Sequence, residues 1–335
     1  MPLVAREFRL RRRPVGMPTG DDFESATREL PALGPGQLRV KNLFLSVDPY
    51  MRGRMTDAKS YVPPFELGAP LEGGAVGQVE ESHHPGFAEG DVVLSMMGWR
   101  DRFVSEGKGL TKLDPRLAPL PAFLGTLGMP GLTAYAGLLD VGALKDGETV
   151  LVSGAAGAVG SVVCQIAKAK GCKVVGVMGS DEKGRWLLEN GCADQVINYR
   201  TTPKLRPAIQ AAAPDGIDLT FENVGGDHLE AALACSKVFG RIVICGLISS
   251  YNTTAAPPGP SNFREILVKR LRVQGLIVTD HARRQPDFLR DMMGWIQAGK
   301  MKWTETIIEG LERMPEAFIG LFDGKNLGKM VVKLA

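Results

Sequence analysis

The chain has 335 residues with a hydrophobic content of 44% and a charged content of 23%, ordinary values for a globular protein with room for two domains. Its 40 basic and 37 acidic residues leave a net charge of +3, too small to indicate binding to nucleic acid or to an acidic membrane surface. No apolar run reaches the roughly 18 residues of a membrane helix, and no signal-peptide core is visible, so we expect a cytoplasmic protein without a membrane segment.

The first part of the chain, residues 1 to about 125, is rich in glycine and proline. Residues 37–47 alternate between apolar and polar side chains, and residues 71–80 form a strand pattern with several glycines. These patterns are typical of short strands in a small, tightly curved β domain. A helix that begins near Gly125, with Pro130 in its first turn, marks the boundary to a second domain.

From about residue 126, predicted strands and helices alternate. This alternation predicts a parallel, doubly wound α/β sheet. The last residues, about 300–335, again contain strand, helix and strand, the last strand at residues 329–333, and we expect them to return to the first domain. The predicted strands of the sheet are residues 149–153, 173–177, 195–198, 216–222, 241–245 and 271–278.

A turn of small residues follows the first of these strands. Its spacing is Ala155-x-Gly157-x-x-Gly160, with alanine at the usual first glycine position. A tight structural turn is the alternative interpretation. However, the turn follows a strand and opens a helix, which is the context in which a dinucleotide pyrophosphate approaches the backbone and the helix N-terminus.

The end of the second strand distinguishes NADP(H) from NAD. An NAD site usually has an acidic residue about 20 residues after the turn, but that distance reaches Val177 and Met178 here. Ser180 and Lys183 follow, and a hydroxyl and an ammonium group suit a 2′-phosphate. We therefore expect NADP(H), with Asp181 as a first-turn helix residue; a solvated Lys183 with no ligand is the alternative.

Two further loops lie at the carboxyl ends of the fourth and fifth strands, where open α/β sheets bind ligands. They are residues 223–226 and 245–252. Tyr251 in the second loop is a candidate acid or enolate-stabilising donor. A structural tyrosine bonded to a ribose or to the backbone is the alternative.

The numbers and spacing of the cysteines and histidines argue against a disulfide framework and against a metal site. The five cysteines are scattered through apolar stretches and are odd in number, as expected of reduced core thiols. The four histidines show no ligand spacing, and there is no cysteine cluster, so no metal is expected. If the chain is an enzyme, a cofactor supplies the chemistry and the protein orients it.

Seven stretches together resemble the zinc-independent branch of the medium-chain dehydrogenase/reductase superfamily. Within it the chain is similar to the group of leukotriene B4 12-hydroxydehydrogenases/prostaglandin reductases, plant alkenal double-bond reductases and bacterial curcumin reductases, over nearly its whole length. The resemblance implies a GroES-like β-barrel substrate domain (about 1–125 and 300–335), a Rossmann NADP-binding domain (about 126–299), an active site in the cleft between them, and a homodimer. The stretches are Leu45–Arg52, Gly125–Tyr135, Ala155–Ser161, Gly171–Val177 with Gly179–Lys183, Glu222–Gly226, Tyr251–Asn252 and Asn326–Lys329.

The resemblance also implies an activity. Members of the group use NADPH to reduce the C=C bond of small α,β-unsaturated aldehydes and ketones, with hydride passing to the β-carbon and the resulting enolate being protonated. Val268 stands where some mammalian members carry a tyrosine discussed as catalytic, which moves the expected catalytic role to Tyr251 and Tyr50. A quinone reductase on the same scaffold and a non-catalytic NADPH-binding protein, like some lens crystallins, are the alternatives.

The expected cofactor contacts follow from the turn, the strand ends and the resemblance together. The turn would hold the pyrophosphate, Lys183 and Tyr199 the adenosine phosphate end, and the remaining residues the rest of the cofactor. The full set is Gly157, Ala158, Val159, Gly160, Ser180, Lys183, Tyr199, Asn223, Cys245, Gly246, Ser250, Tyr251, Leu276, Val278 and Asn326.

Overall fold

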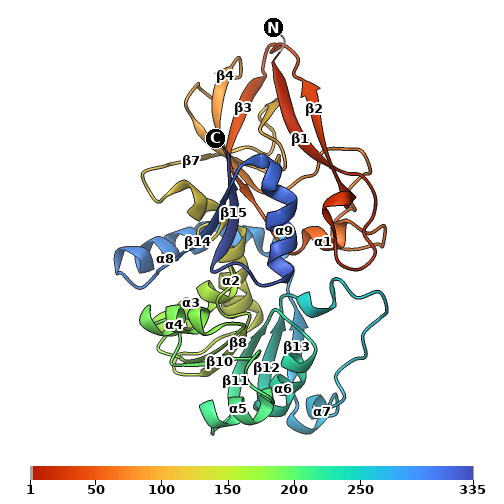
Figure 1. Ribbon diagram of the computed structural model, residues 1–335. Helices are drawn as coiled ribbons and strands as arrows, with labels where there is room; N and C mark the ends of the chain where they lie inside the picture. Colours follow the sequence, from red (N-terminus) through yellow and green to blue (C-terminus); the bar gives the residue numbers. More distant parts are fainter. Residues whose placement is uncertain (1–2, 335) are drawn as a thin grey trace. The chain divides into compact units, whose positions relative to one another are not determined.

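The computed structural model describes residues 3–334 and contains two compact units (Figure 1). One unit is formed by the chain up to Leu124 together with the segment from Glu305 onward, and the other is Gly125–Thr304. Within the described residues, no helix combines the length and the apolar character needed to cross a membrane.

The second unit is built on a six-stranded parallel sheet with the strand order β10-β9-β8-β11-β12-β13. This is the doubly wound order, in which the direction of winding reverses between β8 and β11. The predicted fold class, a Rossmann-type parallel sheet with a second β domain, is confirmed. The strands are β8 (Thr149–Ser153), β9 (Lys173–Met178), β10 (Gln195–Asn198), β11 (Ile217–Glu222), β12 (Ser236–Ile244) and β13 (Arg272–Gly275).

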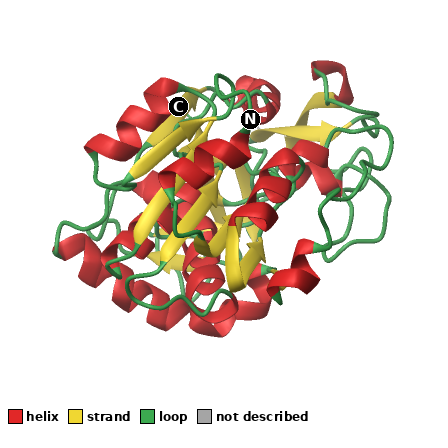
Figure 2. Cartoon of the chain, turned by 90° about the horizontal axis from the view of Figure 1, so that it is seen from below, coloured by secondary structure: helices red, strands yellow, loops and turns green. Residues whose placement is uncertain are grey.

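Helices lie on both sides of this sheet (Figure 2). Helix α2 packs against α3, and α5 packs against α6. Because both faces are covered, the central strands are apolar throughout, with Val150, Val152 and Phe221 fully buried. The helical segments are α2 (Met129–Ala136), η3 (Gly137–Val141), α3 (Gly160–Ala169), α4 (Asp181–Glu189), α5 (Leu205–Ala212), α6 (Asp227–Cys235), η4 (Ile248–Ser250), α7 (Glu265–Lys269), η5 (Val278–Arg284) and α8 (Gln285–Gln297).

The last strand is shorter than the sequence predicts. Residues 271–278 were expected as strand, but β13 ends at Gly275. Strand β13 lies at the edge of the sheet, and its neighbour β12 ends at Ile244, so regular pairing stops there. The amide of Leu276 still donates to the Ile244 carbonyl at 2.9 Å before the chain turns into η5. The short helix α7 was not predicted.

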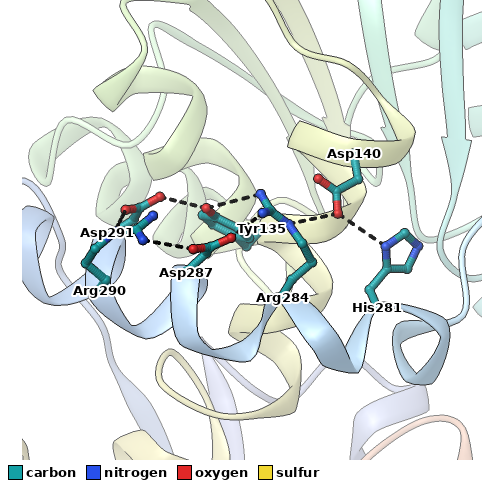
Figure 3. A network of polar contacts seen from close by, with 7 residues as sticks. All are labelled: Tyr135, Asp140, His281, Arg284, Asp287, Arg290 and Asp291. Atoms are coloured by element: carbon teal, nitrogen blue, oxygen red, sulfur yellow. Dashed lines mark hydrogen bonds and ion pairs between the residues drawn. The ribbon is translucent and has the colours of Figure 1, made fainter.

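A polar network fastens α8 to α2 and η3 (Figure 3). The Tyr135 hydroxyl donates to Asp291 Oδ2 at 2.6 Å, and Arg284 Nη2 donates to the same hydroxyl at 3.5 Å. Burial, followed by the bond to Asp291, raises the pKa of Tyr135 to about 12. Arg284 Nε also pairs with Asp140 at 3.1 Å. The network therefore joins segments about 150 residues apart in the sequence, and its other members are His281, Asp287 and Arg290.

The first unit contains a mostly antiparallel sheet with the order β14-β15-β3-β4-β5-β7, in which β6 also pairs with β3. A separate hairpin, β1-β2, accompanies it. The C-terminal strand β15 pairs antiparallel with β3, so the end of the chain completes this unit. The elements are β1 (Val4–Leu10), β2 (Phe23–Glu29), β3 (Leu38–Ser46), α1 (Met51–Arg54), β4 (Ala75–Ser82), β5 (Val92–Ser95), β6 (Arg102–Ser105), β7 (Thr111–Leu113), β14 (Glu305–Glu309), α9 (Met314–Phe322) and β15 (Lys329–Lys333), with short 3-10 turns η1 (Gly20–Asp22), η2 (Leu120–Leu124) and η6 (Leu311–Arg313).

A buried ion pair joins the segment after β3 to strand β15. Lys329 Nζ donates to Asp48 Oδ1 at 2.9 Å and to the Val47 carbonyl at 2.6 Å, and both charged side chains are buried. The Ser46 hydroxyl donates to the other oxygen of Asp48. Burial lowers the pKa of Lys329. A charge buried this deeply is strongly destabilising without its partner, so the pair fixes the segment after β3 against β15.

Candidate cofactor-binding and catalytic site

The glycine turn brings its last glycine, Gly160, close to the backbone of its first glycine, Gly154. Gly154 adopts φ +60°, which favours glycine, and α3 begins at Gly160. A Cβ added to Gly160 would lie 2.3 Å from the Gly154 carbonyl oxygen, whereas one added to Gly157 would come no closer than 3.3 Å to it. The turn thus forms a cradle of small residues at a helix N-terminus, which fits a pyrophosphate. The predicted residues Gly157, Ala158, Val159 and Gly160 all lie in it.

The carboxyl ends of β8 and β11 are tied together by a buried carboxylate that the sequence reasoning did not identify. Glu222 Oε1 accepts hydrogen bonds from Ser153 Oγ at 2.7 Å and from the amides of Val224 and Gly225 at 2.7 and 2.8 Å. Burial raises the pKa of Glu222. The available signal was an acidic residue as the last position of an otherwise apolar buried strand. Glu222 holds the loop after β11 in place.

Two hydrogen bonds to Ser153 place Asn223 beside the glycine turn. Its amide donates to Ser153 Oγ at 2.8 Å, and its side-chain Nδ2 donates to the Ser153 carbonyl at 2.7 Å. A Cβ added to Gly154 would lie 3.6 Å from the Asn223 Cβ. The predicted residue Asn223 therefore lies at the point where the strand order reverses, which is where doubly wound sheets bind dinucleotides.

The end of β9 carries the residues that led to the NADP(H) prediction. Ser180 is the N-cap of α4, and its hydroxyl accepts from the Lys183 amide at 3.4 Å. Asp181 opens the helix, as predicted, and its carboxylate accepts from Asn198 Nδ2 at 2.7 Å. Burial, followed by the charge of Arg200, lowers the pKa of Lys183. Lys183, after β9, and Arg200, after β10, are therefore neighbouring cations. Of the nearby carboxylates, Asp181 is engaged by an amide, and Glu182 shifts the pKa of Lys183 in the opposite direction.

Tyr199 directly follows β10 and reaches across to the end of β9. A Cβ added to Gly179 would lie 2.8 Å from the Tyr199 hydroxyl oxygen. The tyrosine is 39% exposed. The residues predicted for the adenosine phosphate end, Ser180, Lys183 and Tyr199, thus lie at adjacent carboxyl ends of the sheet.

The loop after β12 carries Tyr251, whose hydroxyl lies close to the backbone of its own loop. The Leu247 amide donates to the Tyr251 hydroxyl at 3.3 Å. A Cβ added to Gly246 would lie 3.2 Å from that hydroxyl and 3.3 Å from the Asn223 carbonyl oxygen. Tyr251 and Asn223 therefore flank Gly246. The loop also holds the predicted residues Cys245 and Ser250, and the predicted Leu276 and Val278 follow β13 at the same edge of the sheet.

Two predicted residues, Tyr50 and Asn326, belong to the first unit. Tyr50 directly precedes α1, and burial, followed by the charge of Asp48, raises its pKa. Asn326 Nδ2 donates to the Gly328 carbonyl at 2.8 Å just before β15. Their segments are the ones that the buried pair of Asp48 and Lys329 joins.

Known proteins match the chain over both units. Residues 6–113 match a family described as the N-terminal domain of oxidoreductase, and residues 158–297 match one described as zinc-binding dehydrogenase. The chain is 47% identical to prostaglandin reductase 1 of Rattus norvegicus, covering 98% of this chain and 99% of that protein. It is 43% identical to the NADPH-dependent curcumin reductase of Escherichia coli (strain K12), with coverage of 98% and 97%.

The chain belongs to the zinc-independent branch of the medium-chain dehydrogenase/reductase superfamily. This medium-chain reductase also resembles a solved structure, that of CurA in complex with NADPH from Vibrio vulnificus, with 41% identity, a TM-score of 0.92 and coverage of 98% and 99%. The Escherichia coli quinone oxidoreductase, 21% identical with a TM-score of 0.77, shares the fold. Across residues 3–334, no group of three or more potential metal ligands is present.

Two glycine substitutions in this medium-chain reductase separate folding from cofactor binding. Gly160→Ala forces a Cβ into backbone atoms and is expected to lower the free energy of unfolding by about 3 kcal/mol. Gly157→Ala places a Cβ 3.3 Å from the Gly154 carbonyl oxygen, a tight contact that a shift of a few tenths of an ångström relieves. It is expected to change the free energy of unfolding by less than about 1 kcal/mol while weakening NADPH binding, because this turn is predicted to take the pyrophosphate. Urea unfolding and calorimetric titration measure the two effects; equal losses of stability would contradict the account.

Proposed function

We propose that the chain is an NADPH-dependent reductase of the C=C bond of α,β-unsaturated aldehydes and ketones. The observation that carries this proposal is identity of 43–48% along almost the whole chain with proteins named prostaglandin reductase 1, NADPH-dependent curcumin reductase and NADP(+)-dependent 2-alkenal reductase. The glycine cradle, the neighbouring cations Lys183 and Arg200 after β9 and β10, and the engaged Asp181 suit the same cofactor.

The residues that would hold the cofactor are those gathered at the carboxyl edge of the sheet. The cradle from Gly157 to Gly160 would take the pyrophosphate, and Ser180, Lys183 and Tyr199 the adenosine 2′-phosphate. Asn223 and the loop from Cys245 to Tyr251 would line the nicotinamide half. When bound, NADPH supplies the hydride; the protein supplies position, exclusion of water and hydrogen bonds.

The chain's own contribution to the chemistry is a hydroxyl donor. As the substrate accepts hydride at its β-carbon, negative charge develops on the carbonyl oxygen, and a positioned O–H group stabilises the enolate. Tyr251 and Tyr50 are the two candidates, with the cofactor ribose as the alternative donor. The raised pKa of Tyr50 keeps its phenol protonated, and the Leu247 amide orients the hydroxyl of Tyr251. Water or the same donor then protonates the α-carbon.

We also propose a cytoplasmic homodimer. All five cysteines lie within the described residues as free thiols, and burial raises the pKa of Cys192 and Cys245 to about 12, which suits a reducing compartment. Strand β13 is an edge strand with four exposed residues, and such an edge favours pairing with a second copy. Exposed apolar residues near this edge are Val238, Phe239, Leu267, Val268 and Val273.

Sedimentation velocity is expected to give twice the 36.0 kDa chain mass, and a single-chain mass would contradict the dimer.

The activity is tested directly by mixing the purified chain, NADPH and a panel of acceptors, and following the loss of NADPH absorbance. We expect turnover with simple enones and alkenals, a saturated carbonyl product, and no turnover with the corresponding saturated ketone as the control. Faster reduction of quinones than of every enone would favour the quinone reductase. Tight NADPH binding with no acceptor reduced would favour the non-catalytic alternative.

Tyr251→Phe removes the proposed donor and keeps the ring. If Tyr251 stabilises the enolate, kcat falls by about 10²–10³ while the KM for NADPH changes little, because the hydroxyl acts only as charge develops. Tyr50→Phe is the matched variant on the other candidate. Steady-state kinetics with one enone assign the donor, and wild-type kcat in both variants would move the role to the cofactor ribose.

A further inference from the structure

His228 is a buried polar side chain that the proposed mechanism does not use. It is the second residue of α6, just after the loop that Glu222 holds. The residue is 8% exposed, and its ring atom Nδ1 is buried without a hydrogen-bond partner within residues 3–334. The other ring nitrogen, Nε2, is not among the buried unpartnered atoms of these residues. A polar atom in this position needs an explanation, because an unsatisfied buried group destabilises the fold.

The surroundings of the ring determine where its proton lies. Because Nδ1 is buried without an acceptor in the described part of the chain, we assign the proton of the neutral ring to Nε2. Burial lowers the pKa of His228 to about 4, against the smaller opposing effect of Asp227. At neutral pH the side chain is therefore a neutral ring that presents one N–H donor.

The ring lies beside the proposed adenosine end of the cofactor site. It packs edge-on against Tyr199, with centroids 5.1 Å apart and an interplanar angle of 74°. The Tyr199 hydroxyl in turn lies next to Gly179, which precedes Ser180 and the helix that carries Lys183. His228 is thus linked through Tyr199 to the strand end chosen for the 2′-phosphate.

The charges at this strand end favour a phosphate as the acceptor. Burial and then the charge of Arg200 lower the pKa of Lys183, against the opposing charge of Glu182, so the two cations repel each other, and a bound anion would relieve that repulsion. The carboxylate of Asp181 is already engaged by Asn198. A phosphate offers several acceptor oxygens, and a neutral N–H donor supplies a hydrogen bond without adding a third positive charge.

We infer that His228 donates a hydrogen bond from Nε2 to the 2′-phosphate of NADP(H), making it a specificity-determining residue for NADPH over NADH. The inference rests on the proposed NADPH-dependent function. The contrasting interpretation is that His228 only packs against Tyr199, in which case any aromatic ring of similar size replaces it without loss.

The test compares His228→Phe, which keeps the edge-on packing and removes the donor, with His228→Gln, which keeps a donor. We expect His228→Phe to raise the dissociation constants of NADPH and of the probe 2′,5′-ADP about tenfold, with those of NADH and 5′-AMP unchanged, and His228→Gln to recover part of the loss. Lys183→Ala is the reference for a lost phosphate contact, and His83→Phe on an exposed turn is the unaffected control. Calorimetry gives the constants, and thermal unfolding confirms that each variant is folded.

The outcomes separate this inference from the proposed function. If wild type binds NADPH and His228→Phe binds it equally well, the inference is overturned and the proposed function stands. Equal weakening of NADPH and NADH by His228→Phe also overturns it, because the phosphate is then not the acceptor. If wild type fails to bind NADPH at all, the proposed function fails first.

Discussion

The arrangement of the cofactor site depends on the buried carboxylate of Glu222. It collects three hydrogen bonds at the place where the strand order reverses, so the ends of β8 and β11 cannot separate without leaving buried donors unpaired. Ser153 transmits this constraint to Asn223, and Asn223 lies against the first glycine of the turn. The glycine turn and the loop after β11, which we propose hold the pyrophosphate and line the nicotinamide half, are thus held in one fixed relation by the strand ends beneath them.

A second buried charge has the equivalent role in the other unit. Lys329 and Asp48 connect the C-terminal strand to the segment after β3, and both candidate residues of this unit, Tyr50 and Asn326, are within three residues of a member of the pair. Each unit therefore holds the loops that carry the candidate site residues with a buried acidic side chain. In both cases the acidic group makes several bonds, which is what allows a polar side chain to be retained inside a core.

The sequence predicted those parts of the fold that local patterns determine. The strands at residues 149–153, 195–198 and 329–333 have the predicted bounds, because β-branched runs bounded by turn residues identify buried strands directly. The glycine spacing and the position of Asp181 were likewise local signals. The roles assigned to the individual site residues remain predictions.

What the sequence did not show depends on contacts between distant residues. The bonds of Glu222 to Ser153, the ring of His228 against Tyr199 and the bond from Tyr135 to Asp291 join residues 69, 29 and 156 positions apart, and no local pattern predicts such pairs. The end of β13 was misplaced for a similar reason, since an edge strand ends where its neighbour ends.

The most direct test of the central claim follows the transferred hydrogen itself. The chain is incubated with NADPH carrying deuterium at the transferable C4 position and with a simple enone, and the product is examined by NMR and mass spectrometry. The account predicts a saturated carbonyl compound with one deuterium on the former β-carbon. Deuterium on the carbonyl carbon of an alcohol, or no deuterium in any product, would contradict it.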